Sequence, residues 1–236
     1  MKRIIMMIIR SIWHVPGLLI RLLRMGAHPE RYTEAERYGL LKEIDDYAMK
    51  NGSVDLEIHG IENLPEKNGY ILFPNHQGMF DVLVLVKAMK EPVSVVMKKE
   101  LENVPLLKQV IACMGAIGLD RSDARQGMKV ILQVAEEVKN GKNFIIFPEG
   151  TRSKEGNRLL PFKGGSFKSA QKAKCPIVPV ALIDSYKAFD TGSIKRVRVQ
   201  AYILKPIAYE AYQDMKTTEI AAMVKSQIEA VIAEHE

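Results

Sequence analysis

The sequence predicts an α/β domain with a mostly parallel central sheet flanked by helices, joined to an N-terminal amphipathic two-helix segment. Three observations lead to this prediction. From residue 53 onward, short apolar runs alternate with longer stretches of helical periodicity. Most of these runs are almost continuously apolar, which is typical of strands buried on both faces of a parallel sheet. Residues 1–25, in contrast, contain no acidic residue and have helical periodicity.

The N-terminal segment carries a polar stripe at helical spacing. Its longest purely apolar run, Ile4–Ile9, is shorter than the ~18 residues that a membrane span needs. A basic amphipathic helix with Trp13 at its flank suits the headgroup layer of an anionic membrane; the alternative is a helix packed on the core with a solvated basic face. We favour the membrane interpretation and expect Pro16 to kink or divide the helix. The stripe consists of Arg3, Arg10, His14, Gly17, Arg21 and Arg24.

A second helix completes the N-terminal segment. Thr33 and Glu36 have the spacing of a capping box, and Asn51-Gly52 is a helix-termination signal. The pattern changes to short strands directly afterwards. We therefore expect a helical membrane-association motif at residues 1–52 and an α/β domain at residues 53–236.

The α/β domain is expected to alternate strands with helices along its whole length. We place the last of the strands, at residues 197–204, at an edge of the sheet. Expected strands cover residues 54–58, 70–73, 93–97, 116–119, 144–147, 177–183 and 197–204. Expected helices cover residues 81–89, 106–114, 125–139, 165–174 and 218–233.

The charge balance indicates a negatively charged partner. The net charge is +6 and the pI is about 9.2, which fits a nucleic acid, an anionic membrane or a phosphorylated substrate. Aromatic residues make up only 7%, so nucleic-acid binding is poorly supported. Cys113 and Cys175 lack a C-x-x-C spacing and are expected to be small core residues in a reducing compartment. No His and Cys occur together at ligand spacing, so we expect no metal site.

His76 and Asp81 can form a general base with its orienting carboxylate. Both follow the expected strand at residues 70–73, and open α/β sheets place their sites at the carboxyl ends of strands. Five residues would separate the two side chains on one regular helix. The pairing therefore needs His76 in the turn before the helix and Asp81 in its first turns, with Gly78 allowing the break. The alternative is a strand-end histidine followed by a helix-capping aspartate.

A set of charged residues follows the other expected strands. Lys98 and Lys99 come after the run at 93–97, and Arg121 comes after the run at 116–119. Together with Arg152, these cations can bind a phosphate, unless each is an ordinary surface charge. Glu149 can anchor the cations or position glycerol hydroxyls, and the backbone near Gly150 is a candidate for stabilising an oxyanion.

Taken in order, these segments resemble the blocks of the glycerolipid acyltransferases, and within that family the bacterial lysophosphatidic acid (1-acyl-sn-glycerol-3-phosphate) acyltransferases. The resemblance covers about residues 54 to 185. It rests on Asn75-His76 with Asp81, Gly118-Leu119-Asp120-Arg121, Phe147-Pro148-Glu149-Gly150-Thr151-Arg152-Ser153, Ile177-Val178-Pro179-Val180, Lys98-Lys99-Glu100-Leu101 and Phe162-Lys163-Gly164-Gly165.

The resemblance implies a glycerol-3-phosphate acyltransferase-like fold and the transfer of an acyl group to the sn-2 hydroxyl of lysophosphatidic acid. It implies that His76 is the general base and Asp81 its partner. It also implies that Lys98 and Arg121 bind the acceptor phosphate and that Glu149, Gly150 and Arg152 line the acceptor site. The donor is then acyl-CoA or an acyl-carrier protein, with no cofactor, and the enzyme lies peripherally on the cytoplasmic face of the cell membrane.

Other functions stay open at this point. The acceptor can be glycerol 3-phosphate or another lysophospholipid within the same family. A hydrolase would need a nucleophile or a water-activating site, and neither a G-x-S-x-G motif nor a metal-binding set occurs in the sequence. A membrane-binding module without catalysis would explain residues 1–25 but not the His76 and Arg121 segments.

Overall fold

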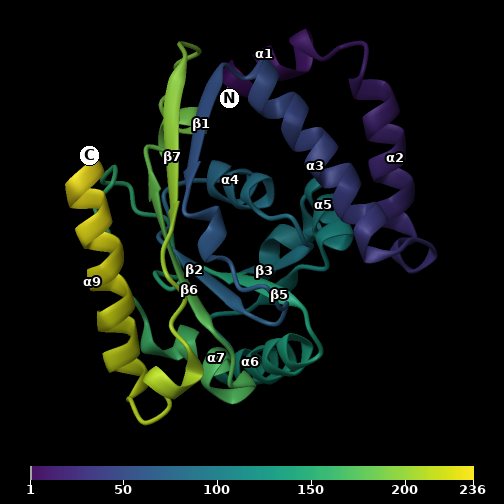
Figure 1. The fold of residues 1–236 in the computed structure, drawn as a ribbon. Coiled ribbons are helices and arrows are strands. Elements are labelled where there is room, and N and C mark those ends of the chain that lie inside the picture. The colour runs from purple at the N-terminus through teal and green to yellow at the C-terminus, as the bar shows by residue number, and fades with distance from the viewer. Residues whose placement is uncertain (1) are drawn as a thin grey trace.

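The computed structural model describes residues 2–236 as a seven-stranded sheet with helices on both faces (Figure 1). The strand order is β1-β7-β6-β2-β5-β3-β4, and of the neighbouring pairs only β6 and β7 are antiparallel. The predicted α/β fold with a mostly parallel sheet is confirmed. The strands are β1 (Val54–His59), β2 (Ile71–Pro74), β3 (Val93–Lys98), β4 (Ile117–Leu119), β5 (Asn143–Ile146), β6 (Ile177–Ile183) and β7 (Val197–Ile203).

The position predicted for the strand at residues 197–204 is wrong. β7 lies between β1 and β6, and the edges of the sheet are β1 and β4. The reason lies in the two different pairings of β7. Its register is parallel to β1, as in Val199 opposite Leu56, and antiparallel to β6, as in Ala201 opposite Leu182. A single sequence does not reveal such a long-range pairing.

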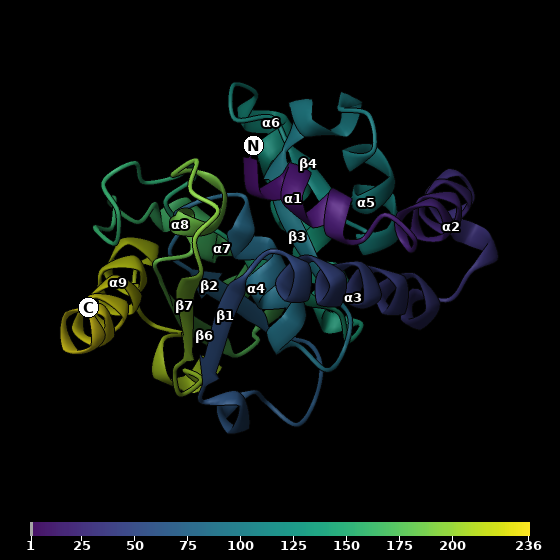
Figure 2. The same ribbon diagram turned by 90° about the horizontal axis from the view of Figure 1, so that it is seen from above.

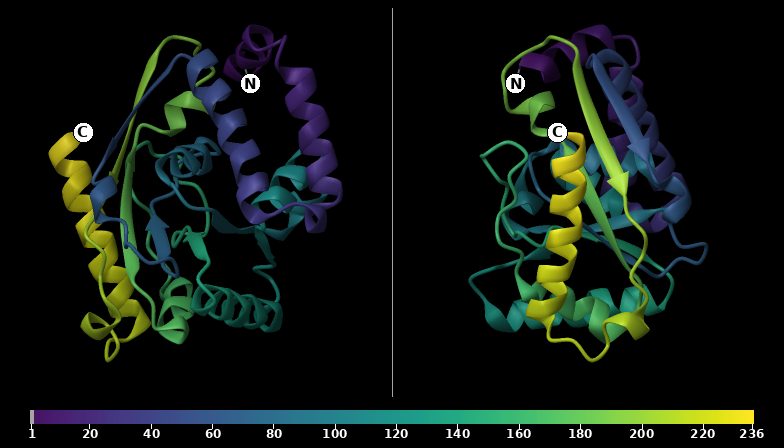
Figure 3. Two further views of the ribbon diagram at one scale, coloured as in Figure 1. Left: turned by 45° about the vertical axis from the view of Figure 1, so that its right-hand side comes forward. Right: turned by 60° about the vertical axis from the view of Figure 1, so that its left-hand side comes forward.

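Two apolar layers hold the helices on the sheet. Alternate side chains of β6 point to opposite faces: Val178 and Val180 belong to one core cluster, and Ile177 and Ala181 belong to the other. On this second face, α9 lies apart from the other helices, along one side of the molecule (Figure 3). The first face is covered by α3 (Glu34–Asn51), α4 (Phe80–Ala88) and α5 (Leu107–Met114). Outside these, α1 (Lys2–Arg10) packs on α3, and α2 (Val15–Ala27) packs on α3 and α5 (Figure 1). The second face is covered by α6 (Ala124–Lys139), α7 (Lys168–Ala173) and α9 (Thr217–His235).

Local signals account for the helix boundaries. Thr33 Oγ1 accepts a hydrogen bond from the Glu36 N–H at 3.2 Å, and the Glu36 carboxylate accepts from the Thr33 N–H at 2.7 Å. This is the predicted capping box, and α3 ends at Gly52 as expected. The helix expected at residues 165–174 begins as a 3₁₀ turn, η4 (Gly164–Phe167), before α7. A short helix that we did not expect, α8 (Tyr186–Phe189), follows β6.

The N-terminal segment forms two helices that meet at a sharp bend. The angle between α1 and α2 is 106°, and Pro16 lies in the first turn of α2, so the predicted division of the helix is confirmed. Seen from above, α2 lies on the side of the molecule opposite to α9 (Figure 2). Within residues 2–236, no helix alone has the length and hydropathy of a membrane span, although the bent pair of α1 and α2 reaches them together.

The prediction that the basic stripe faces outward is wrong for Arg3. Its side chain is 1% exposed, and its guanidinium donates hydrogen bonds to the backbone carbonyls of Ala188 and Lys195, both at 2.7 Å. Burial lowers the pKa of this guanidinium from its ordinary value. Two further arginines of the stripe also bind the protein, since Arg10 donates to Ser53 Oγ at 2.9 Å and Arg21 pairs with Glu43. Arg3 and Arg10 therefore fasten α1 to the α/β domain, and Arg21 joins α2 to α3.

Beside the exposed Arg10, Arg21 and Arg24, the solvent-facing side of α1 and α2 carries a set of exposed apolar side chains. Trp13, in the bend between the two helices, is 92% exposed. The exposed apolar side chains on this side of α1 and α2, which we call the apolar face, are Ile5, Ile8, Ile9, Ile12, Trp13, Ile20 and Leu23.

Other side chains of α1–α3 enter the same core as α4 and α5, so the packing does not mark the predicted boundary at residue 52.

Candidate active site

His76 and Asp81 meet at the carboxyl end of β2. His76 lies in the loop after the strand, and Asp81 is the second residue of α4. His76 Nδ1 is 2.7 Å from Asp81 Oδ2. Because the carboxylate can only accept, Nδ1 carries the proton, and Nε2 is left as the acceptor on a side chain that is 19% exposed. The predicted break between the two residues is confirmed.

The loop between the pair folds tightly around the carboxylate. Asp81 is fully buried, and its Oδ2 also accepts from the backbone N–H groups of Gln77 at 2.7 Å and Gly78 at 3.0 Å. Gly78 lets Asp190 approach the loop closely, because a Cβ at this position would lie 2.5 Å from Asp190 Oδ2 and would displace that side chain.

Glu149 supports the same loop from β5. Its Oε1 accepts from the His76 N–H at 2.6 Å, and its Oε2 accepts from the Leu160 N–H at 2.9 Å. The side chain is buried, and burial raises the pKa of its carboxyl while these backbone hydrogen bonds oppose the rise. We expected Glu149 to line the acceptor site or to anchor cations; the structure instead directs both oxygens to the backbone.

The loop after β5 also contacts the imidazole and the backbone of His76. The Phe147 ring stacks on the His76 ring with centroids 4.0 Å apart and an interplanar angle of 28°. The Ser153 N–H donates to the His76 carbonyl at 2.8 Å. Sequence reasoning missed the role of Phe147, although its place directly before Pro148-Glu149 puts it at the rim of the sheet.

Gly150 forms a tight turn in this loop. Its φ is +70°, a conformation that favours glycine, and its own N–H donates to the Phe147 carbonyl at 3.1 Å. That N–H is therefore already engaged, which argues against it as the oxyanion donor that we considered from the sequence. A Cβ at Gly150 would also lie 3.0 Å from Lys163 Nζ.

Lys98 and Arg121 come to neighbouring positions on the rim. Lys98 ends β3 and is paired in register with Leu119 of β4, two residues before Arg121. Both cations are exposed, and Lys98 forms an ion pair with Glu100 at 3.0 Å. Next to them, hydrogen bonds from Ser122 lower the pKa of Asp120. The structure thus brings two of the predicted phosphate-binding cations together beside β5.

Arg152 lies on the other side of the histidine. It forms an ion pair with Asp190 at 3.7 Å, and Asp190 follows α8 and packs against Gly78. His76 follows β2. The strand β6, which leads to α8 and Asp190, lies on one side of β2. The strands β3 and β4, which lead to Lys98 and Arg121, lie on its other side, beyond β5. The single convergence of cations that we expected is therefore divided into two positions that flank His76.

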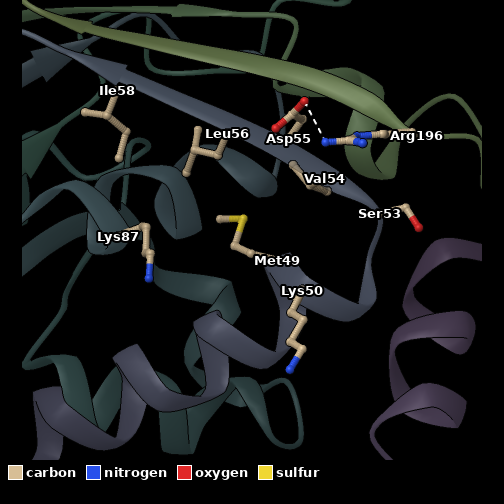
Figure 4. A pocket seen from close by; sticks show the side chains of 9 residues that line it. All are labelled: Met49, Lys50, Ser53, Val54, Asp55, Leu56, Ile58, Lys87 and Arg196. Carbon is tan, nitrogen blue, oxygen red and sulfur yellow. Dashed lines mark hydrogen bonds and ion pairs between the residues drawn. The ribbon is translucent and has the colours of Figure 1, made fainter.

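A pocket of about 560 Å³ lies elsewhere, between α3 and the edge strand β1 (Figure 4). Arg196 at its rim is paired with Asp55 across the two strands. None of the predicted site residues lines it, so it contributes nothing to the chemistry at His76. Its lining residues are Met49, Lys50, Ser53, Val54, Asp55, Leu56, Ile58, Lys87 and Arg196.

Cys113 and Cys175 are both free and buried, as predicted. Burial raises the pKa of the Cys175 thiol to about 12 and also raises the pKa of the Cys113 thiol. Both thiols are therefore held neutral and unreactive inside the two core clusters.

Comparison with known proteins gives one consistent result. The sequence profile of the acyltransferase family matches residues 55–183. The 1-acyl-sn-glycerol-3-phosphate acyltransferase of Saccharomyces cerevisiae is 36% identical over 74% of this chain and 59% of its own length. The enzyme of the same name from Escherichia coli is 32% identical over 70% of this chain and 67% of its own length.

Other relatives differ mainly in their length. The chloroplastic enzyme of that name from Brassica napus is 35% identical, and the match spans 44% of it, so this chain corresponds to about half of some longer relatives. The crystal structure of the 1-acyl-sn-glycerophosphate acyltransferase from Thermotoga maritima superposes with a TM-score of 0.75 at 23% identity, and the match covers 99% of this chain and 97% of that one. At that identity the likeness concerns the fold, and it includes the N-terminal helices.

Proposed function

The chain belongs to the acyltransferase family, and from this premise we propose that it transfers a fatty acyl group from an acyl thioester to the sn-2 hydroxyl of lysophosphatidic acid, giving phosphatidic acid. The relatives that bear the corresponding name support this acceptor. The observation that carries the proposal is the hydrogen bond between His76 Nδ1 and Asp81 Oδ2, since it leaves Nε2 as an acceptor at the carboxyl rim of the sheet.

In the proposed reaction, His76 Nε2 takes the proton from the acceptor's 2-hydroxyl as that oxygen attacks the thioester carbonyl. The tetrahedral intermediate then collapses, the carbon–sulfur bond breaks, and the imidazolium gives its proton to the departing thiolate. Asp81 stabilises the imidazolium that forms between the two steps. General base catalysis supplies ~10²- to 10⁴-fold, so positioning of the two substrates must contribute the remainder. The acyl carrier, CoA or acyl-carrier protein, is a substrate, and no cofactor is needed.

We assign the acceptor phosphate to Lys98 and Arg121. They extend from neighbouring strands beside β5, and both are exposed to solvent. Arginine can bind a phosphate through two hydrogen bonds, and lysine adds a point charge. We assign Arg152, across the histidine, to a second anionic group, such as a phosphate of the acyl carrier or a membrane headgroup. Glu149 and Gly150 shape the loop after β5 that carries Arg152.

We propose further that α1 and α2 attach the enzyme to one leaflet on the cytoplasmic face of the cell membrane. The apolar face supports this placement, because such side chains gain free energy in the boundary between headgroups and acyl chains. Arg24, from the basic stripe, remains exposed beside it and is suited to anionic lipid. Membrane binding then rests on the apolar side of the helices first and on charge second.

The test is a matrix of purified full-length protein against lysophosphatidic acid, glycerol 3-phosphate and a lysophospholipid, each with acyl-CoA and with an acyl-carrier protein. We expect the highest kcat/KM with lysophosphatidic acid and no product from His76→Ala. A higher kcat/KM with either other acceptor would refute the assigned substrate. Thioester hydrolysis that does not require any acceptor would refute acyl transfer.

A further inference from the structure

Ser185 contacts Asp81 through the carboxylate oxygen that does not face His76. It follows β6 and the left-handed residue Asp184, whose φ is +63°. The Ser185 side chain is completely buried, and its hydroxyl has two acceptors in reach, Asp81 Oδ1 and Gln77 Oε1, the latter at 2.9 Å. Its single proton goes to Asp81 Oδ1, because a charged carboxylate is the stronger acceptor. Because no part of Ser185 reaches solvent, this serine cannot act as a nucleophile. The proposed mechanism above gives no role to its contact with Asp81.

The two oxygens of Asp81 have different partners. Oδ2 faces His76 Nδ1, whereas Oδ1 faces the Ser185 hydroxyl. Rotation about the Cβ–Cγ bond would move both oxygens together, so a hydrogen bond at Oδ1 restrains the direction in which Oδ2 meets the imidazole. It acts in addition to the Gln77 and Gly78 N–H groups, which also donate to Oδ2.

Ser185 is in turn held by a buried chain of amides. Its N–H donates to Gln77 Oε1 at 2.9 Å, and Gln77 Nε2 donates to Asn157 Oδ1 at 2.7 Å. Asn157 Oδ1 also accepts from the Asp184 N–H at 2.8 Å. Gln77 and Asn157 are both buried, so these hydrogen bonds lie away from competing water.

This chain joins three separate segments. Gln77 comes from the loop that contains His76, Asn157 comes from the loop after β5, and Asp184 and Ser185 come from the end of β6. The hydroxyl of Ser185 therefore has one fixed position relative to Asp81. Without the hydroxyl, Oδ1 would be a buried acceptor that has lost this donor, which costs free energy in the ionised form.

We propose that Ser185 is a positioning residue for the base: its hydroxyl, held through Gln77 and Asn157, fixes the Asp81 carboxylate so that His76 keeps its proton on Nδ1. The inference rests on the proposed acyl transfer. In this proposal, the residue that orients Asp81 lies just after β6, outside the segment that contains both His76 and Asp81.

The test compares Ser185→Ala with Ser185→Thr, which keeps the hydroxyl. Loss of one hydrogen bond to a charged group should lower kcat about tenfold to a hundredfold, with the KM of both substrates unchanged. Ser185→Thr should restore most of the rate. Ser94→Ala is the matched control, because Ser94 is equally buried and donates to the Met114 carbonyl at 2.9 Å, but lies at the amino end of β3. Thermal unfolding of each variant confirms that it is folded.

Two further measurements separate positioning from a general loss of structure. In an Asp81→Asn background, Ser185→Ala should cause little additional loss of kcat, since it acts through the carboxylate. Nitrogen-15 NMR of the His76 ring should show a smaller fraction of the Nδ1–H tautomer in Ser185→Ala, and it needs no substrate. It therefore remains decisive even if the proposed acceptor is wrong. An unchanged tautomer, or equal losses from Ser185→Ala with and without Asp81, would overturn the proposal.

Discussion

The Asn75 side chain hydrogen-bonds both backbone groups of Leu182: Asn75 Oδ1 accepts from the Leu182 N–H at 2.7 Å, and Asn75 Nδ2 donates to the Leu182 carbonyl at 3.0 Å. Asn75 directly precedes His76, and Leu182 is in β6, the neighbouring strand of the sheet. The contact replaces strand pairing where β2 has ended, and it fixes the starting point of the catalytic loop.

Asn75→Ala should therefore destabilise the protein and lower its activity together. Both backbone groups of Leu182 would lose their partner in a buried place, at a cost of ~1–3 kcal/mol each. Urea unfolding should show a decrease of this order in the free energy of unfolding. Asn140→Ala, at an exposed asparagine that follows α6, is the control and should be nearly neutral. Equal stability of Asn75→Ala and wild type would contradict the structural role of this contact.

The proposed role of His76 and Asp81 gives the most direct prediction for activity. His76→Ala should abolish acyl transfer, and Asp81→Asn should lower kcat by ~10²-fold or more, because the amide cannot hold the Nδ1 proton in the same way. Circular dichroism should show that both variants are folded. Near-wild-type turnover by a folded His76→Ala protein would show that another group is the base.

Much of this site could be predicted because it follows local rules. Runs of apolar residues identified the strands, and residues after each strand end must share one rim of a parallel sheet. That reasoning brought His76, Asp81, Lys98 and Arg121 to one rim, and the resemblance selected the His76–Asp81 pair over a helix-capping aspartate. The structure shows the pair at hydrogen-bonding distance and pairs Lys98 in register with Leu119, two residues before Arg121.

The remainder depends on contacts between distant segments. The carbonyl groups that bury Arg3 come from residues 52–53 and 188–195, so nothing near Arg3 in the sequence separates it from an exposed arginine. The Glu149 carboxylate likewise points into the protein, where it accepts hydrogen bonds from the His76 N–H and the Leu160 N–H, and these two partners are distant from each other in the sequence. The position of Arg152 depended on Asp190, which lies in a short helical region that the sequence pattern did not reveal.

Asp45 gives a prediction about pH and stability. It lies on α3, is buried, and has no hydrogen-bond partner at either oxygen among residues 2–236. Burial raises its pKa to about 7, against the opposing effect of Lys87 and Lys42. The folded state therefore binds a proton that the unfolded state has lost, and stability should fall as the pH rises from about 4 to about 7, by at most ~4 kcal/mol.

Urea unfolding at several pH values across this window measures the slope, and Asp45→Asn should remove most of it. Asp214→Asn is the control, because Asp214 is an exposed aspartate and does not act on the pKa of Asp45. If Asp45→Asn keeps the wild-type slope, the titrating group is a different one.

The apolar face can be tested with a probe that the chain already contains. Trp13 is the only tryptophan and is 92% exposed, so its fluorescence should shift to shorter wavelength when vesicles are added. Ile9→Asp should weaken vesicle binding at least tenfold, because it places a charge in the apolar face. Leu132→Asp is the matched control, since Leu132 is exposed on α6, on the opposite face of the sheet. Equal weakening by both variants would place the membrane surface elsewhere.

Arg121 separates an enzyme that selects phosphate from a general lipid acylase. The side chain follows β4 next to Lys98 and is exposed to solvent. A hydrogen bond from it to a phosphate is worth ~1.5–3 kcal/mol, and ~1.4 kcal/mol is a factor of ten, so Arg121→Ala should raise the acceptor KM about tenfold or more. The donor KM should change little, because the acyl carrier need not contact this position.

A dephosphorylated acceptor should be a poor substrate for the wild type, and Arg121→Ala should hardly change its turnover. Arg125→Ala, at an exposed arginine one turn further along the chain, controls for the loss of positive charge alone. If Arg121→Ala impairs the phosphorylated and the dephosphorylated acceptor equally, then Arg121 supports the rim and does not bind the phosphate.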